Sequence, residues 1–436
     1  MTVIRADPGK ITKDRLAEWI ENHNTRRYNI LQDYYEARHN ILGRRSADPS
    51  KPNNKIVNNY PGYIVDVNVG YFLGEPVAYT SQDETMMQDI QDIFDYNDEQ
   101  DHNVRLGEEK SISGHAYELL YLDDQADIRF GKVSPANMFV IYDTKIIPDI
   151  IAAVRWWQEG DGKESTTYVE LYTDREIVYY QKPPGQAMTE YARTGHPFGD
   201  VPVVEYLNND QRQGDFEKVL SAIDAYDKAQ SDTANDFEYF ADAYLKIRNM
   251  SGTKEEDVAE MKKNRVILLD DDGDADWLIK QINDAAAENY KNRLQHDIHR
   301  FSKTPNLTDV QFGTQVTGIA LRYKLWGLEQ NAVNKERKMK KGLQRRIELI
   351  CNVLAVKGKV YDWRDVQMTF TRNIPAVLPE LANMVQQLKG IVSDKTLLAQ
   401  LPFVEDPAGE LERLEEQDQG IDLDSIDLGT ADEGDE

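Results

Sequence analysis

Two long amphipathic segments, separated by a short loop, occupy residues 282–356 and constrain the fold more than any other feature of the chain. Apolar residues recur every three or four positions in both segments, which places them on one face of a helix. They are Ile282, Ala286, Tyr290, Leu294, Ile298 and Phe301, then Leu321, Leu325, Leu328, Ala332, Met339, Leu343, Ile347, Ile350 and Leu354. Pro305 cannot continue the first helix. The second helix, of roughly forty residues, measures about 55 Å. It is therefore expected to reach between neighbouring modules or subunits.

The N-terminal part of the chain also shows helical periodicity. The expected helices cover residues 12–42, 55–72, 83–94 and 103–122. Thr12 is a suitable N-cap for the first helix, and Gly43 can end it. Residues 55–72 are apolar on more than one face, which predicts a buried helix.

The pattern changes between residues 127 and 207, where short alternating runs rich in β-branched and aromatic residues are separated by turn residues. The runs are residues 128–133, 138–142, 150–158, 166–172, 177–181 and 203–207. An antiparallel sheet is the expected result, so the fold class is α+β and mainly helical.

A third long helix is expected over residues 215–247, with one side rich in carboxylates. The acidic residues on that side are Glu217, Asp224, Asp227, Glu238 and Asp242. They are consistent with a solvated polar face or with an acidic surface that lines something. The next residues, up to 281, form a small insert in which Arg265–Leu269 and Trp277–Ile279 are expected to be strands joined by an acidic turn.

Composition limits the classes of protein to which the chain can belong. The chain has 436 residues, 40% of them hydrophobic, which suggests two to four domains with sizeable cores. No run of eighteen apolar residues and no apolar signal core is present, so neither a membrane span nor ordinary secretion is expected. The single cysteine, Cys351, is expected to be a buried thiol.

The net charge of −26 is unevenly distributed. Residues 405–436 hold fourteen acidic residues against Arg413 alone, so half of the excess lies in a tail that is expected to be solvated and disordered. The rest of the chain is also acidic overall. This argues against a protein that grips nucleic acid over a broad basic face.

The sequence offers little support for catalysis or metal binding. The acidic turn at residues 270–276 fails as an EF-hand, because taking Gly273 as the sixth position puts Leu268 first and Ile279 twelfth. His296 and His299 are three residues apart on a helix, but no third ligand can be assigned to them. We therefore assign no catalytic residue, no cofactor and no metal.

A basic stretch lies within the longest helix, where residues 335–346 hold seven lysines or arginines against Glu336 alone. Two partners are possible for this stretch: nucleic acid, or the acidic faces of neighbouring copies of the chain. Aromatic residues for base stacking are absent from it. We favour a subunit interface, with Lys335, Lys338, Lys341 and Arg345 as its basic residues.

Several sequence blocks, in this order, resemble the portal proteins of tailed bacteriophages, of the SPP1-like type. The blocks are Lys51-Pro-Asn-Asn-Lys-Ile-Val-Asn-Asn-Tyr60, Val69-Gly-Tyr-Phe-Leu-Gly-Glu-Pro76, Gly214-Asp-Phe216, Ser231-Asp-Thr-Ala-Asn-Asp-Phe237, Thr304-Pro-Asn-Leu-Thr-Asp309 and Ser393-Asp-Lys-Thr-Leu-Leu-Ala-Gln-Leu-Pro-Phe-Val404. The resemblance covers roughly residues 34–416. The joint order of the blocks is more specific than any one of them.

The resemblance implies a non-enzymatic ring, usually a dodecamer, at one vertex of the virion capsid, assembled in the host cytoplasm. Double-stranded DNA would pass through it without sequence specificity, inward during packaging and outward during ejection. The implied partners are further copies of the chain, the terminase large subunit, a head-completion or adaptor protein, and the major capsid and scaffolding proteins, with no membrane. Carboxylates facing the channel would repel the DNA phosphates, whereas dense lysine contacts would hold them.

The resemblance also implies wing, stem, clip and crown regions, with long stem helices and the antiparallel sheet in the wing. The implied regions are residues 1–213 (wing), 214–248 (stem helix), 249–281 (clip), 282–303 (second stem helix), 304–317 (tunnel loop), 318–375 (long kinked helix and wing return), 376–404 (crown) and 405–436 (acidic tail).

Site residues follow from these regions. In the tunnel loop they are Asn306, Asp309, Gln311, Thr314 and Gln315; on the acidic stem, Asp224, Asp227, Glu238 and Asp242; and in the clip, which would dock terminase and adaptor, Lys254, Asp271, Asp272, Asp274 and Trp277.

Two alternatives stay open at this point. One is a structural or scaffolding capsid protein that forms no ring. The other is a nucleic-acid-processing enzyme that uses residues 270–276 with a metal ion.

Overall fold

The computed structural model places most of the chain in two compact units. It describes residues 3–46, 48, 51–240, 244–248, 254, 256, 274–278, 284–308, 318–373, 378–398, 401, 404, 407, 409–411, 413 and 414. The first unit holds the residues up to 308 together with 325–373, and the second holds residues 309–324 and those from 374 onward. The chain is an α+β protein and mainly helical, as its sequence predicts.

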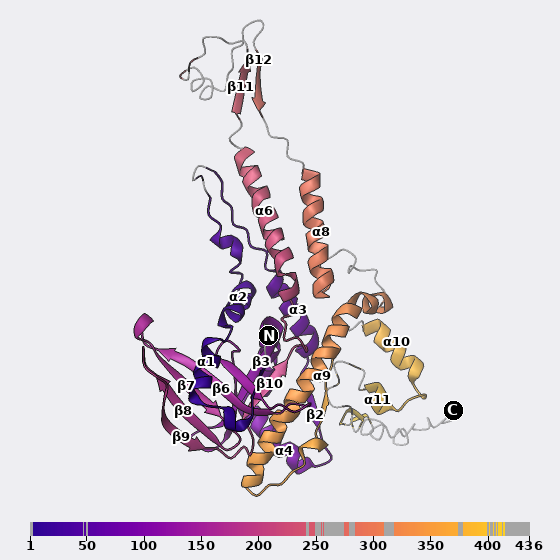
Figure 1. Cartoon of the computed structure of the whole chain (residues 1–436). Helices are drawn as coiled ribbons and strands as arrows, with labels where there is room; N and C mark the ends of the chain where they lie inside the picture. The colour runs from indigo at the N-terminus through magenta and orange to yellow at the C-terminus, as the bar shows by residue number, and fades with distance from the viewer. Residues whose placement is uncertain are drawn as a thin grey trace, which may run out of the picture. The chain divides into compact units, whose positions relative to one another are not determined.

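A six-stranded sheet forms one layer of the first unit (Figure 1). Its strands, in spatial order, are β1 (Ile4–Arg5), β5 (Met138–Tyr142), β6 (Ile150–Glu159), β7 (Thr166–Tyr172), β8 (Glu176–Lys182) and β9 (Thr189–Gly195). All pairings are antiparallel except that of β1 with β5. Four of the six expected strands lie in this sheet, together with β1 and β9, which the sequence pattern missed; the other two expected strands, at residues 128–133 and 203–207, belong to a second sheet.

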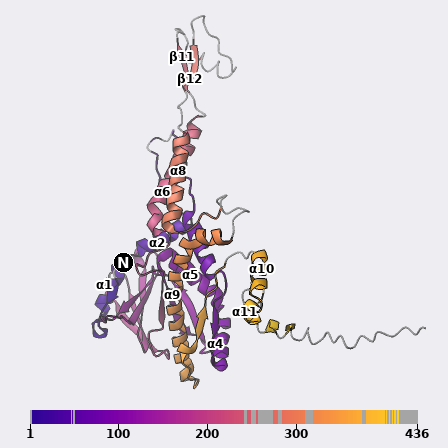
Figure 2. The same cartoon turned by 90° about the vertical axis from the view of Figure 1, so that its right-hand side faces the viewer.

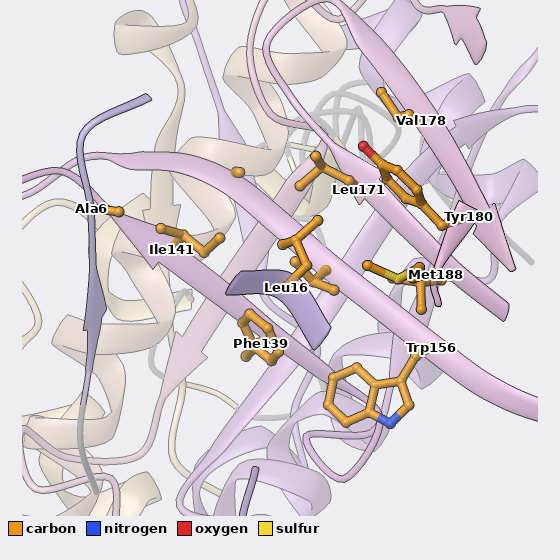
Figure 3. Close-up of a cluster of buried hydrophobic side chains, with 12 residues drawn as sticks. Ala6, Leu16, Phe139, Ile141, Trp156, Leu171, Val178, Tyr180 and Met188 are labelled. Carbon is orange, nitrogen blue, oxygen red and sulfur yellow. The ribbon is translucent and has the colours of Figure 1, made fainter. Parts of the chain in front are cut away.

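Helix α1 (Lys13–Glu21) packs its apolar side on this sheet. Leu16 is fully buried among Phe139, Ile141 and Trp156 (Figure 3). The helix expected over residues 12–42 is in fact two, because the chain leaves α1 at residue 22 and restarts at α2 (Thr25–Tyr35), where Asn24 accepts a hydrogen bond from the Arg27 N–H.

A second, three-stranded sheet packs against the first through a shared apolar cluster. Its strands are β10 (Val203–Leu207), β3 (His115–Leu122) and β4 (Ile128–Val133). The prediction of a helix over residues 103–122 is wrong for the second half of this range. Gly114, at φ +88°, ends helix α5 (Glu99–Ser113), and a Cβ there would lie 2.2 Å from the Arg212 carbonyl oxygen. Only glycine fits this turn, and the chain continues as β3.

Five helices of the first unit, with α6 (Leu220–Phe240) among them, form a further core. Helix α3 (Tyr60–Leu73), with α2, α5 and α8 (Asp284–Ser302), surrounds buried residues that include Ile64, Val69 and Ile298. Asn59 caps α3 by accepting a hydrogen bond from the Gly62 N–H, and Pro61 lies in its first turn. The buried helix expected over residues 55–72 is thus present, but it begins at Tyr60 rather than at residue 55. Helix α4 (Glu84–Tyr96) also packs on α5.

Helix α6 (Leu220–Phe240) packs against α8, and the two lie side by side in both views (Figure 1, Figure 2). Between them in the chain, β11 (Tyr244–Arg248) and β12 (Asp274–Leu278) form an antiparallel hairpin pair. The long helix expected up to residue 247 therefore ends earlier. The expected strand at Arg265–Leu269 lies outside the described residues.

Helix α9 (Gly318–Val356) is the very long helix that the apolar spacing predicts, with 39 residues. Leu328, Met339 and Ile350 of the predicted stripe are buried, as is Cys351, whose pKa burial raises to about 11. Gly342 lets the helix approach β10 closely, because a Cβ at this position would lie 2.4 Å from the Tyr206 ring.

The remaining elements are short. They are β2 (Ala78–Thr80), which pairs with β13 (Gln367–Thr369), the 3-10 turns at Pro8–Lys10, Asn40–Gly43, Gly162–Glu164, Glu217–Val219 and Trp363–Asp365, and, in the second unit, helices α10 (Leu378–Leu388) and α11 (Asp394–Leu398). None of the helices that the structure describes combines the length and the apolar character needed to cross a membrane.

Candidate functional site

The acidic side of α6 is lined by polar groups from the N-terminal part of the same chain. We call these contacts the α6 seam. The seam pairs Tyr34 and Asn40 with Asp224, His39 and Asn58 with Asp227, Arg44 with Asp232, the Ile56 N–H with Ser231, and Asn54 with Asn235 and Glu238. Many polar groups on the acidic side of α6 are therefore hydrogen-bonded to residues of the same chain rather than to solvent.

Asp227 lies at the centre of the seam and is 0% exposed. Its Oδ1 accepts hydrogen bonds from the backbone N–H and the Nδ2 of Asn58, at 2.8 and 2.9 Å, and its Oδ2 lies 2.5 Å from His39 Nδ1. His39 Nε2 lies 3.1 Å from the carbonyl oxygen of Tyr34. The prediction that Asp227 lines a channel is wrong, because its carboxylate is enclosed by its own chain.

The other acidic stem residues differ from Asp227 in exposure. Asp224 is partly buried and accepts hydrogen bonds from the Tyr34 hydroxyl at 2.5 Å and from Asn40 Nδ2 at 3.3 Å. Glu238 is exposed, and its Oε2 accepts a hydrogen bond from Asn54 Nδ2 at 2.7 Å. Asp242 lies outside the described residues. Asp224 and Glu238 thus remain accessible within the isolated chain.

The start of the predicted tunnel loop is anchored to α3. The Tyr63 hydroxyl donates to the Pro305 carbonyl oxygen and accepts from the Leu307 N–H, each at 2.8 Å. Buried Asn68 donates to Thr304 Oγ1, also at 2.8 Å. Asn306 accepts hydrogen bonds from Thr308, which closes a local turn. The predicted loop residues Asp309, Gln311, Thr314 and Gln315 lie outside the described residues.

Only part of the predicted clip is described. Asp274 and Trp277 lie in β12, where they pair in register with Arg248 and Leu245 of β11. Lys254 is exposed, and Asp271 and Asp272 lie outside the described residues. Within the part of the chain that the structure covers, no three His, Cys, Asp or Glu side chains gather closely enough to hold a metal ion.

The basic stretch of α9 is largely occupied by partners in its own chain. Lys335 is buried and donates to Ser111 Oγ at 2.8 Å and to Asp215. The assignment of Lys335 to a subunit interface is therefore wrong. Lys338 pairs with Asp210, and Arg345 lies 2.9 Å from carboxylates of Asp200 and Glu348, but both cations keep some exposure. Lys341 is exposed.

Arg346, which the sequence places in the same basic stretch, is also fully buried. Its Nη1 lies 2.8 Å from Glu99 Oε1 and 3.0 Å from Asn103 Oδ1, both on α5. Its Nη2 and Nε lie 2.7 and 3.1 Å from the two carboxylate oxygens of Glu118 on β3. One guanidinium therefore joins α9 to α5 and to the three-stranded sheet.

Polar and aromatic neighbours complete this cluster. Glu118 also accepts a hydrogen bond from the Tyr206 hydroxyl and contacts His102 Nε2, each at 2.8 Å. Burial alone raises the pKa of Glu118, but the charge of Arg346 and the contact with His102 lower it to about 2. The Phe130 ring lies 4.7 Å from the guanidinium carbon of Arg346. Glu118 is thus a buried carboxylate held in its ionised form.

The burial of Lys335 and Arg346 could have been predicted from their spacing relative to the apolar residues of α9. Lys335 lies three residues after Ala332 and four before Met339, and Arg346 lies three after Leu343 and four before Ile350. Both therefore fall on the apolar stripe of α9 rather than on its solvent-facing side. A cation at such a position indicates a buried ion pair, whereas Lys338, Lys341 and Arg345 lie off this stripe.

Comparison with known proteins identifies the family. The model of the family described as phage portal protein, SPP1 Gp6-like, matches residues 17–422. The chain belongs to this family of phage portal proteins.

Two curated portal proteins also match most of the portal chain. The portal protein of Bacillus phage SPP1 is 28% identical over 407 residues, which cover 88% of this chain and 79% of the relative. The portal protein of Clostridium phage phiCD119 is 24% identical over 426 residues, which cover 90% of this chain and 93% of the relative. The predicted resemblance is thereby confirmed.

Membership fixes the broad role of the portal chain. Phage portal proteins are structural components of the virion capsid, associated with capsid assembly and with DNA passage. The two buried clusters, around Asp227 and around Arg346, are accordingly interpreted as parts of the portal fold.

Proposed function

We propose that this portal protein forms a closed ring of identical subunits, a dodecamer, at one vertex of the capsid. A separate terminase motor pumps the genome inward through the ring, and the genome later leaves by the same route. The observation that carries this proposal is the family match over residues 17–422, which leaves little of the chain outside the portal family.

The surface of the α6–α8 pair supports self-association. Phe237 on α6 and Tyr290 and Phe301 on α8 are large apolar residues that are 57%, 52% and 59% exposed. Exposed aromatic residues on packed helices are typical of surfaces that another chain covers. A neighbouring copy that covers these side chains accounts for their exposure in the single chain.

The remaining carboxylates of the stem suit a passage for DNA. In the proposed ring, Asp224, Glu238 and Asp242 face the channel, and Asn306, Asp309, Gln311, Thr314 and Gln315 of the loop approach the DNA. A lumen poor in lysine releases few counterions from DNA, so the duplex slides without adhering and without sequence specificity. The intrachain pairing of Lys335 and Arg346 keeps two cations of α9 out of such a lumen.

Other surfaces of the ring are assigned to protein partners. The terminase large subunit and the head-completion or adaptor protein dock on the clip, through Lys254, Asp271, Asp272, Asp274 and Trp277. Lys338, Lys341 and Arg345 meet the acidic surface of the neighbouring copy. The major capsid and scaffolding proteins contact the assembled ring, which forms in the host cytoplasm.

Ring closure is the first test of this function. Purified chain should give particles with a central hole in end-on electron micrographs and a native mass near 600 kDa, which is about twelve copies of the 50.1 kDa chain. Replacing exposed Tyr290 and Phe301 with serine should lower the yield of rings, whereas the same change at Tyr121, exposed on β3, should not. Monomers or dimers alone, under all assembly conditions, would favour the rival non-ring structural protein.

The loop gives a second test. A variant shortened within residues 309–316, with the anchored residues 304–308 retained, should form rings of unchanged mass but package less DNA. The physical reason is that Tyr63 fixes the base of the loop to α3, so a shorter loop reaches less far while the fold is unaffected. Genome content per head is measured beside ring mass. Normally filled heads in this variant would contradict the assignment of the loop to DNA.

A further inference from the structure

A cavity of about 610 Å³ lies in the first unit, where the three-stranded sheet meets the six-stranded sheet. Residues of β3, β4 and the four strands from β6 to β9 line it. Its apolar lining includes Leu119, Leu122, Val133, Tyr172, Ile177 and Phe198. An apolar cavity of about 150 Å³ already holds a benzene molecule, so this one has room for two aliphatic side chains.

The charged side chains in the wall of this cavity are cationic. Lys132 and Arg155 line the cavity, whereas none of the described residues in its wall is an aspartate or a glutamate. Lys132 Nζ lies 3.0 Å from Glu109, and Arg155 Nη1 lies 2.9 Å from Glu170. The two cations are 35% and 37% exposed, but their carboxylate partners are only 7% and 12% exposed. In a chain with a net charge of −26, this wall therefore attracts a ligand that combines apolar groups with carboxylates.

Strand β9 provides a free strand edge beside the cavity. It is the last strand of the six-stranded sheet, and all seven of its residues are exposed. Thr194 and Gly195, at the end of β9, line the cavity. No strand that the structure describes pairs with the outer edge of β9. Backbone N–H and C=O groups along such an edge can pair with an extended segment of chain.

The amino-acid sequence after Leu414 has a pattern that fits the cavity. Its only large apolar residues are Ile421, Leu423, Ile426 and Leu428. They form two copies of the tripeptide Ile-Asp-Leu, at residues 421–423 and 426–428, and no lysine or arginine follows Arg413. In an extended backbone the isoleucine and leucine of each copy fall on one side and the aspartate on the other. At roughly 100° per residue, a helix would instead divide the four apolar residues between opposite sides.

We propose that the cavity binds an Ile-Asp-Leu motif of this chain's own C-terminal segment. The isoleucine and leucine of the motif enter the cavity, its backbone pairs with the edge of β9, and Asp422 or Asp427 comes close to Lys132 and Arg155. Binding removes apolar area from water and gives the exposed cations additional carboxylate partners. The second copy of the motif raises the chance that one of the two is bound. This contact goes beyond the proposed function and does not depend on ring formation.

Disulfide trapping in the full chain tests the proposal, because the single native cysteine, Cys351, is buried. One new cysteine replaces exposed Thr194 at the cavity, and the other replaces Ser425, between the two motifs. Under mild oxidation with oxidised glutathione, Thr194→Cys/Ser425→Cys should form a disulfide about ten times faster than Glu18→Cys/Ser425→Cys, because binding raises the local concentration of the thiol. Glu18 is a matched control, since it is exposed on α1, which packs on the other face of the six-stranded sheet.

Substitutions in the C-terminal segment separate specific binding from simple reach. Replacing the four apolar residues of both motifs with serine keeps the length and the charge of the segment. This change should slow trapping at Thr194→Cys about tenfold and leave the rate at Glu18→Cys unchanged. Replacing Asp422, Asp424 and Asp427 with asparagine should also slow trapping at Thr194→Cys, by a larger factor at low salt than at high salt.

A link within one chain and a link between two copies differ in mass on a denaturing gel. Either link supports the proposal, and neither requires a closed ring. Equal trapping rates at Thr194→Cys and Glu18→Cys, or a rate at Thr194→Cys that the four serines leave unchanged, would overturn the proposal. The cavity would then be free for another protein, and the proposed ring would stand or fall separately, by its native mass.

Discussion

Replacing Arg346 with methionine is expected to lower the free energy of unfolding by about 3–5 kcal/mol, the range for breaking a buried ion pair from one side. The guanidinium lies between Glu99 and Glu118, and all three side chains are almost fully buried. Methionine fills part of the volume but leaves both carboxylates in a region of low dielectric. The loss should therefore come from the two unpaired acids rather than from a cavity.

Urea unfolding followed by circular dichroism gives this free energy, and Arg345→Met is the matched control. Arg345 is the next residue of α9, with a side chain that is 22% exposed, and its ion pairs with Asp200 and Glu348 are only partly buried. Its replacement should change the free energy of unfolding by about 1 kcal/mol or less. Equal effects at the two positions would show that Arg346 does not join the helices through its charge.

Asp227→Ala is expected to lower the free energy of unfolding by about 3 kcal/mol. The carboxylate accepts two hydrogen bonds from Asn58 and contacts His39, and all of these groups become unsatisfied when it is removed. His39 is itself buried, so water cannot easily replace the lost partner. The α6 seam should loosen, with faster amide exchange in α6.

Glu238→Ala provides the comparison, because both residues are acidic, lie on α6 and were assigned to the channel by sequence. Glu238 is exposed and makes a hydrogen bond only with Asn54 among the contacts described for its side chain. Its loss should change the free energy of unfolding by less than about 1 kcal/mol. Similar destabilisation by the two variants would contradict the contrast in burial that separates them.

The helices and strands that were predicted correctly from the sequence are those in which buried apolar residues recur at a regular spacing. Leu328, Met339 and Ile350 recur at helical spacing, and α9 runs unbroken through them. The strands at residues 128–133, 138–142, 150–159, 166–172, 176–182 and 203–207 lie where the apolar runs predict them, whereas β9, which is exposed along its whole length, was not predicted. Such periodicity indicates which side of a helix or strand is buried. The reason is that each apolar side chain contributes separately to the free energy of burial, so no distant partner has to be known.

The errors fall where a single residue or a distant partner decided the outcome. Gly114 converts an expected helix into α5 followed by β3, because the turn needs a positive φ and no Cβ. The acidic side of α6, expected to lie open, is instead met by residues far earlier in the chain, such as His39. Helical projection identifies a polar face but does not show what covers it.

The amino-acid sequence alone was enough to predict the portal family, the mainly helical α+β class, the long helix α9 and the acidic tail. Only the tertiary structure decided which charges are buried and with what they pair. Asp227 meets His39 across 188 positions of sequence, and Arg346 meets Glu118 across 228. The physical reason is that a charge in the interior is stable only beside a specific partner. Short-range periodicity carries no information about pairs so far apart.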